Sequence, residues 1–304
     1  MLTLQNIARG CRHLSRRVTM DSTIIRPSRS LEGRVAIITG AGALGDGIGN
    51  GRATAIMLAE DGCSVVCVDL KEDSAQRTAD MIQEEGLGSA FAMAGDVTKP
   101  EHCQRIVETA VSKFGRLDIL VNNVGILGPR VTAVEVDTIE FMKGLEINVL
   151  SMVQMAKFAI PAMTKNEGQV AGSIVNMGSV AGLRGGTPNL LYPTSKGAVV
   201  NMTRAMAANH AKERIRVNCL CPGMVYTPMM HGSDSMSDAE REARKARSLL
   251  GTEGNGWDVG AAVRFLASDQ SRWMTGVILP LDAGTTAATG IGAKSLHDST
   301  SSKE

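Results

Sequence analysis

The sequence RVAIITGAGALGDGIGNG, residues 34–51, decides the fold class. Residues 35–38 form a short, wholly apolar run, which is the pattern of a strand buried on both faces in a parallel sheet. A glycine-rich turn follows, and the apolar residues of 53–59 predict a helix. Glycines between a strand and a helix let the backbone approach a phosphate group, which the free N–H groups of the helix N-terminus attract. This stretch therefore predicts the first strand, turn and helix of a nucleotide-binding α/β domain.

The same alternation continues along the chain. Further strands are predicted at residues 65–68, 90–93, 119–121, 173–177, 216–220 and 277–279, with helices at 72–85, 100–114, 137–164, 190–212, 237–250 and 256–268. Strands that alternate with helices form parallel βαβ units with right-handed crossovers. We therefore expect an α/β protein with a single Rossmann domain over residues 31–286. Its doubly wound parallel sheet would have about seven strands, helices on both faces, and its ligand at the carboxyl ends of the strands.

The composition excludes several classes of function. A net charge of +1 and an aromatic content of 3% provide no surface for nucleic acid, so no such partner is expected. No apolar run reaches the roughly 20 residues that span a bilayer, so no membrane partner is expected either. The six cysteines are scattered, without matching pairs at zinc spacing. We therefore expect reduced thiols in the core, no bound metal, and a protein that is not secreted.

The two ends of the chain differ from the rest. Residues 1–20 contain four arginines and no acidic residue, with apolar residues at helical spacing opposite the arginines. That pattern is typical of an organelle transit peptide, but a disordered basic tail, or translation from Met20, explains it equally well. The expected location is accordingly cytoplasmic or mitochondrial. We treat residues 1–30 as an N-terminal extension and residues 287–304, rich in Ser, Gly and Thr, as a polar C-terminal tail.

Polar residues end the following strands at the edge where the glycine turn lies. Asp69 ends the second strand, 18 residues after Gly51. A carboxylate there accepts hydrogen bonds from the ribose hydroxyls of NAD and repels the 2′-phosphate of NADP, which favours NAD; an ordinary strand-end Asp is the alternative. Asp96 and Val97 end the third strand, where they would meet an adenine ring. Residues 122–125 (NNVG) end the fourth, where a polar turn would border the cofactor.

Tyr192 and Lys196 lie four residues apart at the start of a predicted helix, and therefore on one face. An ammonium group beside a phenol lowers the pKa of the phenol, which would make Tyr192 an acid or base near neutral pH. Ser179 follows the fifth strand on the substrate side, where its hydroxyl can hydrogen-bond a carbonyl oxygen. By spacing alone such a Tyr/Lys pair is more often structural, so further support is needed.

That support comes from a resemblance to the short-chain dehydrogenase/reductase family over residues 31–284. The matching motifs stand in the family's order and approximate spacing: Thr39-Gly40 with Gly49 and Gly51, Asp96, Asn122-Asn123-Val124-Gly125, Asn148, Ser179, Tyr192-Pro193-Thr194-Ser195-Lys196 and Pro222-Gly223-Met224-Val225-Tyr226-Thr227. So many motifs in one order do not arise by chance. The resemblance implies an NAD(P)-dependent oxidoreductase that interconverts a secondary alcohol and a ketone.

The resemblance also implies a role for each matched residue. Tyr192 would exchange a proton with the substrate oxygen, Lys196 would hold the nicotinamide ribose, and Ser179 would orient the substrate. Asn148 would hold a water that relays protons between Lys196 and solvent. The cofactor, NAD in preference or else NADP, would be bound by Gly40, Gly49, Asn50, Gly51, Asp69, Asp96, Val97, Asn123, Gly125, Tyr192, Lys196, Pro222, Val225 and Thr227.

Two positions depart from the family's pattern. The family's glycine turn has three residues between Thr-Gly and Gly-x-Gly, whereas residues 41–48 make eight here, an insertion of five. We align residues 49–51 with the helix start because they lie at the family's distance from Asp69. The alternative, residues 45–49, would move the phosphate contacts. Val124 replaces the Ala that is more common in the family, which is a conservative change.

The segment 226–256 is expected to lie over the substrate. Flexible apolar side chains gather near it and near the catalytic residues: Met224, Met229, Met230, Met236, Leu183, Leu190 and Leu191. Such side chains suit an adaptable apolar pocket, although ordinary packing explains them equally well. No cation for a substrate carboxylate is evident beyond Arg130 and Arg184. We therefore expect an apolar or cyclic small-molecule alcohol or ketone as substrate.

Two other functions compete with this one. A catalytically idle, NAD-binding regulatory protein could use the same fold, but it would not need all four of Asn148, Ser179, Tyr192 and Lys196. Epimerisation or dehydration of a nucleotide sugar would need a larger C-terminal substrate domain, and only about 20 residues follow the last predicted strand. The resemblance further suggests a homotetramer or homodimer built on the long helices.

Overall fold

Seven parallel strands form one sheet at the centre of the molecule. The protein is described by a computed structural model over residues 26–86, 88–231 and 236–288. The strand order is β3 (Ala90–Ala94), β2 (Ser64–Asp69), β1 (Val35–Thr39), β4 (Ile119–Asn122), β5 (Gly172–Met177), β6 (Ile215–Pro222) and β9 (Ile278–Leu281). The chain builds outwards from β1 to one edge and from β4 to the other, so the order reverses between them. The predicted Rossmann sheet is confirmed, and such a reversal opens a ligand crevice.

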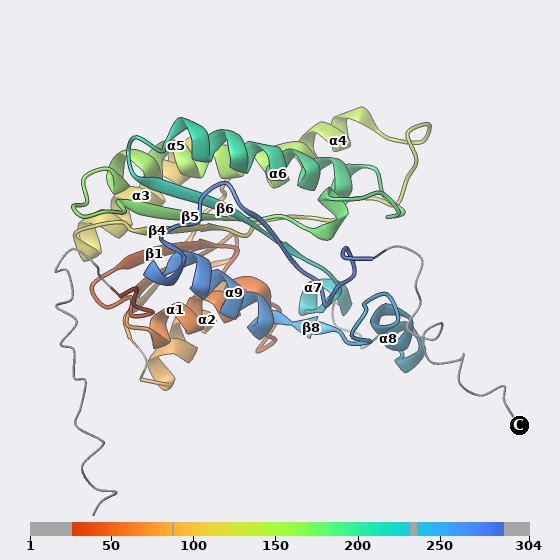
Figure 1. The fold of residues 1–304 in the computed structure, drawn as a ribbon, viewed down its shortest axis with the longest axis horizontal. Helices are drawn as coiled ribbons and strands as arrows, with labels where there is room; N and C mark the ends of the chain where they lie inside the picture. Colours follow the sequence, from red (N-terminus) through yellow and green to blue (C-terminus); the bar gives the residue numbers. More distant parts are fainter. Residues whose placement is uncertain (1–25, 87, 232–235, 289–304) are drawn as a thin grey trace, which may run out of the picture.

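Helices cover both faces of the sheet (Figure 1). One face carries α1 (Asn50–Glu60), α2 (Glu72–Glu84) and α9 (Gly256–Ala267), and the other carries α3 (Pro100–Phe114), α5 (Ser151–Met163) and α6 (Leu191–Asn209). The apolar run of β1 is buried from both sides. Ala36 and Ile38 pack into the cluster with α1 and α9, whereas Val35 and Ile37 pack into the cluster with α3 and α5. This two-sided burial explains why β1 has no polar alternation.

The long helix predicted at residues 137–164 is present but interrupted. It consists of α4 (Thr138–Leu145), a π-helical turn (Glu146–Leu150) and α5. Its start is fixed by Asp137, whose carboxylate accepts hydrogen bonds from the N–H groups of Ile139 (2.8 Å) and Glu140 (3.1 Å). Single π turns inside helices often mark functional sites, and this one contains Asn148.

The segment over the carboxyl edge of the sheet differs most from the prediction. It contains β7 (Val225–Tyr226), α7 (Pro228–His231), α8 (Asp238–Lys245) and β8 (Gly254–Asn255). The helix predicted over 237–250 is wrong beyond Lys245. Ser248 ends it, because its buried hydroxyl donates to the carbonyl oxygen of Thr252 (2.9 Å) and accepts from the Thr252 N–H (3.0 Å). A short 3-10 turn at Val180–Gly182 follows β5, and another at Asp269–Ser271 follows α9.

The predictions for the chain ends lie largely outside the described residues. The basic segment 1–20 and most of the polar tail 287–304 belong to that part, so their nature stays a prediction. Within the described ranges, no helix is both long and apolar enough to cross a membrane. Cys63, Cys67, Cys103, Cys219 and Cys221 are free and buried, as expected for thiols in a core.

Candidate active site

The glycine turn packs the start of α1 against the end of β1. A Cβ atom on Gly51 would lie 2.0 Å from the carbonyl oxygen of Gly40 and 2.7 Å from Nδ2 of Asn123, so only glycine fits. Gly40 itself has a φ of +66°, which favours glycine. Gly49 is the N-cap of α1, which begins at Asn50. The predicted helix start at residues 49–51 is confirmed, and the five extra residues lie in the loop before it.

The residues at this end of the sheet fit the pyrophosphate of NAD(P). The first N–H groups of α1 have no partner within the helix and point towards its N-terminus. Asn123 Nδ2 donates to the carbonyl oxygen of Gly40 (2.9 Å), and the Asn123 N–H donates to Thr39 Oγ1 (3.2 Å). The turns after β1 and β4 therefore form one rigid cradle with a close, side-chain-free approach.

The residues predicted to meet adenosine lie near this cradle but do not line the cavity. Asp69 Oδ2 accepts a hydrogen bond from the Gly42 N–H (3.0 Å), so the inserted loop itself holds this carboxylate. Asp96 Oδ1 accepts from the N–H (2.9 Å) and hydroxyl (2.7 Å) of Thr98. Burial works to raise the pKa of Asp96, but these bonds outweigh it and the pKa is lowered. Val97 is buried in the core. The adenosine contacts of all three stay predictions.

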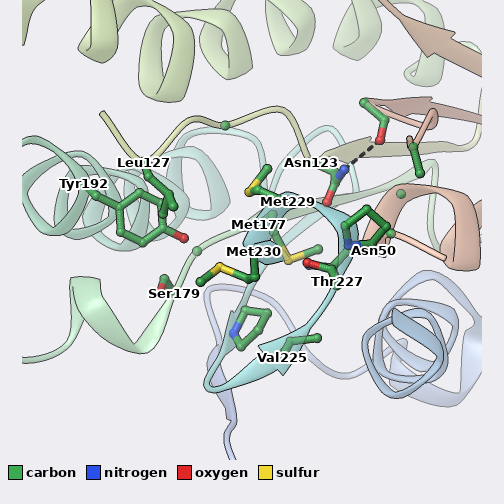
Figure 2. Close-up of a pocket in the computed structure, with 18 of the residues that line it drawn as sticks. Asn50, Asn123, Leu127, Met177, Ser179, Tyr192, Val225, Thr227, Met229 and Met230 are labelled. Carbon is green, nitrogen blue, oxygen red and sulfur yellow. Dashed lines mark hydrogen bonds between the residues drawn. The ribbon is translucent and has the colours of Figure 1, made fainter. Parts of the chain in front are cut away.

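A cavity of about 440 Å³ runs along the carboxyl edge of β1, β4, β5 and β6. Its lining brings together most of the predicted site: Gly40, Gly49, Asn50, Gly51, Asn123, Gly125, Ser179, Tyr192, Lys196, Pro222, Val225 and Thr227. Figure 2 shows Asn50 and Asn123 at one end and Tyr192 and Ser179 at the other. Residues predicted from five separate stretches of sequence therefore converge on one elongated site.

The reactive end contains Tyr192, Lys196 and Ser179. Lys196 lies one turn after Tyr192 in α6, with Nζ 5.7 Å from the centre of the phenol ring. Lys196 Nζ also donates to the carbonyl oxygen of Met177 at the end of β5 (2.7 Å). Ser179 is held as the N-cap of the following turn, where its Oγ accepts from the Ala181 N–H (3.1 Å). Helix α6 thus positions Tyr192 and Lys196, and the turn after β5 positions Ser179.

The pKa values at this end depart from the prediction. Burial raises the pKa of the Tyr192 phenol, and its hydrogen bond with Ser179 opposes that rise only in part. The expected lowering by Lys196 is therefore wrong for this arrangement. The reason is burial, which also lowers the pKa of Lys196 from 10.5 to about 8. Tyr192 is thus a protonated phenol at neutral pH, which is the form that can donate a proton.

Leu191 positions Tyr192. Its side chain fills a notch made by two glycines: a Cβ atom on Gly144 of α4 would lie 2.2 Å from Leu191 Cδ2, and one on Gly128 would lie 2.6 Å from it. Because Leu191 is the first residue of α6, this contact holds the end of the helix that carries Tyr192. The two glycines were visible in the sequence, but nothing in the sequence indicated that Leu191 packs against them. Leu191 was predicted to border the pocket and is instead buried.

Asn148 does not line the cavity. It is fully buried, and both its amide hydrogens are used: Nδ2 donates to the carbonyl oxygen of Ile126 (2.9 Å) and to Ser195 Oγ (3.0 Å). Its Oδ1 accepts from the Ile126 N–H (2.8 Å). The Asn148 side chain therefore ties the turn after β4 to α6. Both amide hydrogens of Asn148 are thus used within the protein, and its role in holding a water stays a prediction.

Apolar side chains line the cavity beside the reactive end and between its two ends. Met229 and Met230 line the cavity as predicted, together with Leu127, Met177 and Pro228, which the sequence analysis did not single out (Figure 2). The other predicted members, Met224, Met236, Leu183 and Leu190, do not line it. Neither do Arg130 and Arg184; the latter donates to the carbonyl oxygen of Thr285 (2.7 Å). Leu127 and Met177 follow β4 and end β5, so their position at the strand ends was the available signal.

Metal ligands do not gather at this site. Over the described ranges, no group of three or more His, Cys, Asp and Glu side chains could hold a metal ion. Among the described residues that line the cavity, Lys196 is the only cation.

Comparison with known proteins found a matching family model and similar proteins of known structure or activity. A family model described as enoyl-(acyl carrier protein) reductase matches residues 42–286. Meso-2,3-butanediol dehydrogenase from Serratia marcescens is 33% identical over 260 residues, which are 85% of this chain and 97% of that protein. The crystal structure of a short-chain type dehydrogenase/reductase from Mycobacterium marinum is 31% identical with a TM-score of 0.77, covering 86% of this chain and 98% of that chain. A 7α-hydroxysteroid dehydrogenase, solved with NADH and 7-oxo glycochenodeoxycholic acid, is 33% identical with a TM-score of 0.76, covering 84% and 95%.

Proposed function

This chain belongs to the short-chain dehydrogenase/reductase family, and on that premise we propose that Tyr192 is the acid and base of its reaction. Like its relatives, the chain is an NAD(P)-dependent oxidoreductase that acts on CH–OH groups. The observation that carries the proposal is the cavity itself. Tyr192 and Ser179 lie together at one end, and the other end fits a pyrophosphate.

The proposed chemistry follows from the groups at the reactive end. Bound NAD(P) would supply or accept the hydride. During reduction, Tyr192 donates its phenolic proton to the carbonyl oxygen while the Ser179 hydroxyl hydrogen-bonds the same oxygen. During oxidation, Tyr192 takes the proton of the alcohol and must first lose its own. Because burial raises the pKa of Tyr192, the rate of oxidation should rise with pH.

Lys196 has a second role in the proposal. Among the described residues, its buried Nζ has one acceptor, the carbonyl oxygen of Met177, and it borders the cavity beside Gly125. The remaining N–H groups of Lys196 are free to hold the nicotinamide ribose hydroxyls, which aligns the cofactor with the substrate.

The proposed substrate is an uncharged, apolar or cyclic secondary alcohol or its ketone. Leu127 lies beside Tyr192, and Met177, Met229 and Met230 line the cavity between its two ends. Apart from Lys196, a cation that could pair with a substrate carboxylate is missing from this lining among the described residues. The named relatives act on a small diol and on a steroid, which both carry secondary alcohols. Methionines adapt their shape to a ligand, so they suit an apolar substrate of moderate size.

NAD is the proposed cofactor in preference to NADP. Asp69 ends β2, where its carboxylate would face the adenosine ribose and repel a 2′-phosphate. The Gly42 N–H holds that carboxylate at 3.0 Å. A relative solved with NADH is consistent with this choice.

We also propose that the chain forms a homodimer or homotetramer through α4 and α5. Large apolar side chains are exposed along these helices, including Ile139 (80%), Met142 (63%) and Val153 (39%). Apolar patches of this kind mark interaction surfaces. Light scattering after gel filtration tests this, and Met142→Glu should shift an oligomer towards smaller species.

The decisive experiment measures NAD and NADP turnover by the purified protein across cyclic and aliphatic secondary alcohols and ketones. Tyr192→Phe removes only the phenolic oxygen and should lower turnover at least about a hundredfold while leaving NAD binding intact. Tyr226→Phe is the matched control, because Tyr226 is the only other tyrosine and does not line the cavity. Tight NAD binding without turnover on any substrate would instead favour an idle NAD-binding regulator.

A further inference from the structure

One buried arginine lies behind the glycine turn and takes no part in the chemistry proposed above. Arg52, in the first turn of α1, has no exposed surface and is the largest fully buried side chain in the described part of the chain. Within those residues no carboxylate lies within ion-pair distance of its guanidinium. Burial lowers the pKa of Arg52, and the carboxylates of Asp46 and Asp69, at longer range, offset that lowering only in part. Burying an unpaired cation is unfavourable, so its hydrogen bonds must compensate.

Arg52 donates most of its hydrogen bonds to backbone carbonyl groups of the inserted loop, residues 41–48. Nη1 donates to the carbonyl oxygens of Gly45 (2.7 Å) and Gly47 (2.8 Å), and Nη2 donates to that of Ala43 (3.4 Å). Nε donates to Thr78 Oγ1 (3.0 Å). The Thr78 hydroxyl in turn donates to the carbonyl oxygen of Ala41 (2.8 Å). The carbonyl groups of four alternate loop residues thus converge on Arg52 and Thr78.

The other side of this loop borders the cavity. Gly42, Ala43 and Leu44 line it next to Gly49 and Asn50, whereas Arg52 and Thr78 do not. Because Arg52 and Thr78 lie outside the cavity lining, the loop carbonyl oxygens that bond to them point away from the cavity. Carbonyl oxygens carry partial negative charge, and a dinucleotide pyrophosphate is an anion that needs N–H donors instead.

We propose that Arg52 is a positioning residue for dinucleotide binding: it holds the carbonyl groups of the inserted loop away from the phosphate site and leaves an unpaired positive charge behind it. The longer loop has more carbonyl groups that need hydrogen-bond donors. The planar guanidinium of arginine can donate to several of them at once. Lysine, with three donors and no fork, could not satisfy the same set. The inference rests on the proposed dinucleotide site.

The test measures binding by calorimetry of NAD, ADP and adenosine, without turnover. Arg52→Met should weaken NAD and ADP by at least about tenfold, because loop carbonyl groups turn towards the phosphates and the charge is lost. Adenosine, which has no phosphate, should bind within about twofold of the wild type. The matched control is Arg77→Met, because Arg77 also contacts the loop, through Asp46 (2.7 Å), but lies at the exposed side. It should leave ADP binding within about twofold.

Equal ADP binding by Arg52→Met and the wild type would overturn the inference. So would a parallel loss of adenosine binding, or an equal loss in Arg77→Met, since either means that the loop has only become disordered. Where Arg52→Met does not fold, Thr78→Val carries the same test. It is nearly isosteric and frees the carbonyl group of Ala41, so ADP binding should weaken about threefold with adenosine unchanged. Wild-type protein that binds neither NAD nor ADP would refute the proposed function itself.

Discussion

Replacing Lys196 with methionine should stabilise the folded protein while removing its activity. Lys196 is buried, and burial lowers its pKa from 10.5 to about 8. A proton therefore binds the folded protein less tightly than the unfolded chain, and each pKa unit corresponds to about 1.4 kcal/mol. The charged lysine thus reduces the free energy of unfolding at neutral pH by about 3 kcal/mol. Methionine has a similar length and bears no charge.

Part of that gain is lost again. The variant lacks the hydrogen bond from Lys196 Nζ to the carbonyl oxygen of Met177, and an unpaired buried acceptor costs about 1–2 kcal/mol. The net expected stabilisation near neutral pH is therefore about 1–2 kcal/mol. For a domain of this size that corresponds to a rise in Tm of roughly 2–8 °C.

The pH dependence identifies the cause. Between the folded pKa of about 8 and the unfolded value of 10.5, the unfolded chain keeps the proton that the folded protein has lost. The free energy of unfolding of the wild type therefore rises with pH relative to the variant, and this contribution is lost again as pH falls through about 8. The stability advantage of Lys196→Met should disappear by about pH 10.

The assay is thermal unfolding of both proteins across this pH range, without added cofactor. Lys212→Met is the matched control: Lys212 is exposed, so its replacement should change Tm little at any pH. A Lys196→Met protein that is less stable than the wild type at neutral pH would refute the reasoning. So would a difference in Tm that does not change with pH.

Three further predictions address the rest of the site. Gly51→Ala should weaken NAD binding in a titration at least about tenfold, because its Cβ would lie 2.0 Å from the Gly40 carbonyl oxygen; Gly185→Ala, with open space around it, is the control. Asp69→Asn should raise kcat/KM with NADP relative to NAD at least about tenfold by removing a like charge, and an unchanged ratio would mean that another residue selects the cofactor. Glu253→Gln should raise the substrate KM about fivefold, because the buried Glu253 carboxylate pairs with two arginines of α8, a helix without buried residues; an unchanged KM would show that α8 stays in place without this pair.

Local sequence patterns predicted most of the fold. Each strand of the main sheet was predicted from a short apolar run, which is the pattern of a strand buried on both faces, such as β1. The predicted helix over 237–250 failed beyond Lys245, because Ser248 bonds to Thr252 and ends it. The π turn around Asn148 was not predicted either, since its surroundings include Ile126 and Ser195 from distant parts of the chain.

The candidate site divides in the same way. Local periodicity located the strand ends and helix starts at which Gly49, Gly51, Ser179, Tyr192 and Lys196 lie. The oxidoreductase activity was predicted from the resemblance of these motifs, in their order and spacing, to the short-chain dehydrogenase/reductase family, because spacing alone left the Tyr192/Lys196 pair open to a structural role.

What only the tertiary structure decided are the properties that depend on neighbours from elsewhere in the chain. Burial, not the nearby ammonium, sets the direction of the Tyr192 pKa. The side chain of Leu191 packs against Gly128 and Gly144, and Arg52 donates hydrogen bonds to the carbonyl groups of the inserted loop. Neither contact is evident from the residues next to Leu191 or Arg52 in the sequence. By itself, the sequence determined the elements, which follow from periodicity, and indicated the reacting groups through the resemblance of its motifs to the family. Desolvation and side-chain packing arise only once distant segments meet, so the protonation and precise placement of those groups belong to the folded chain.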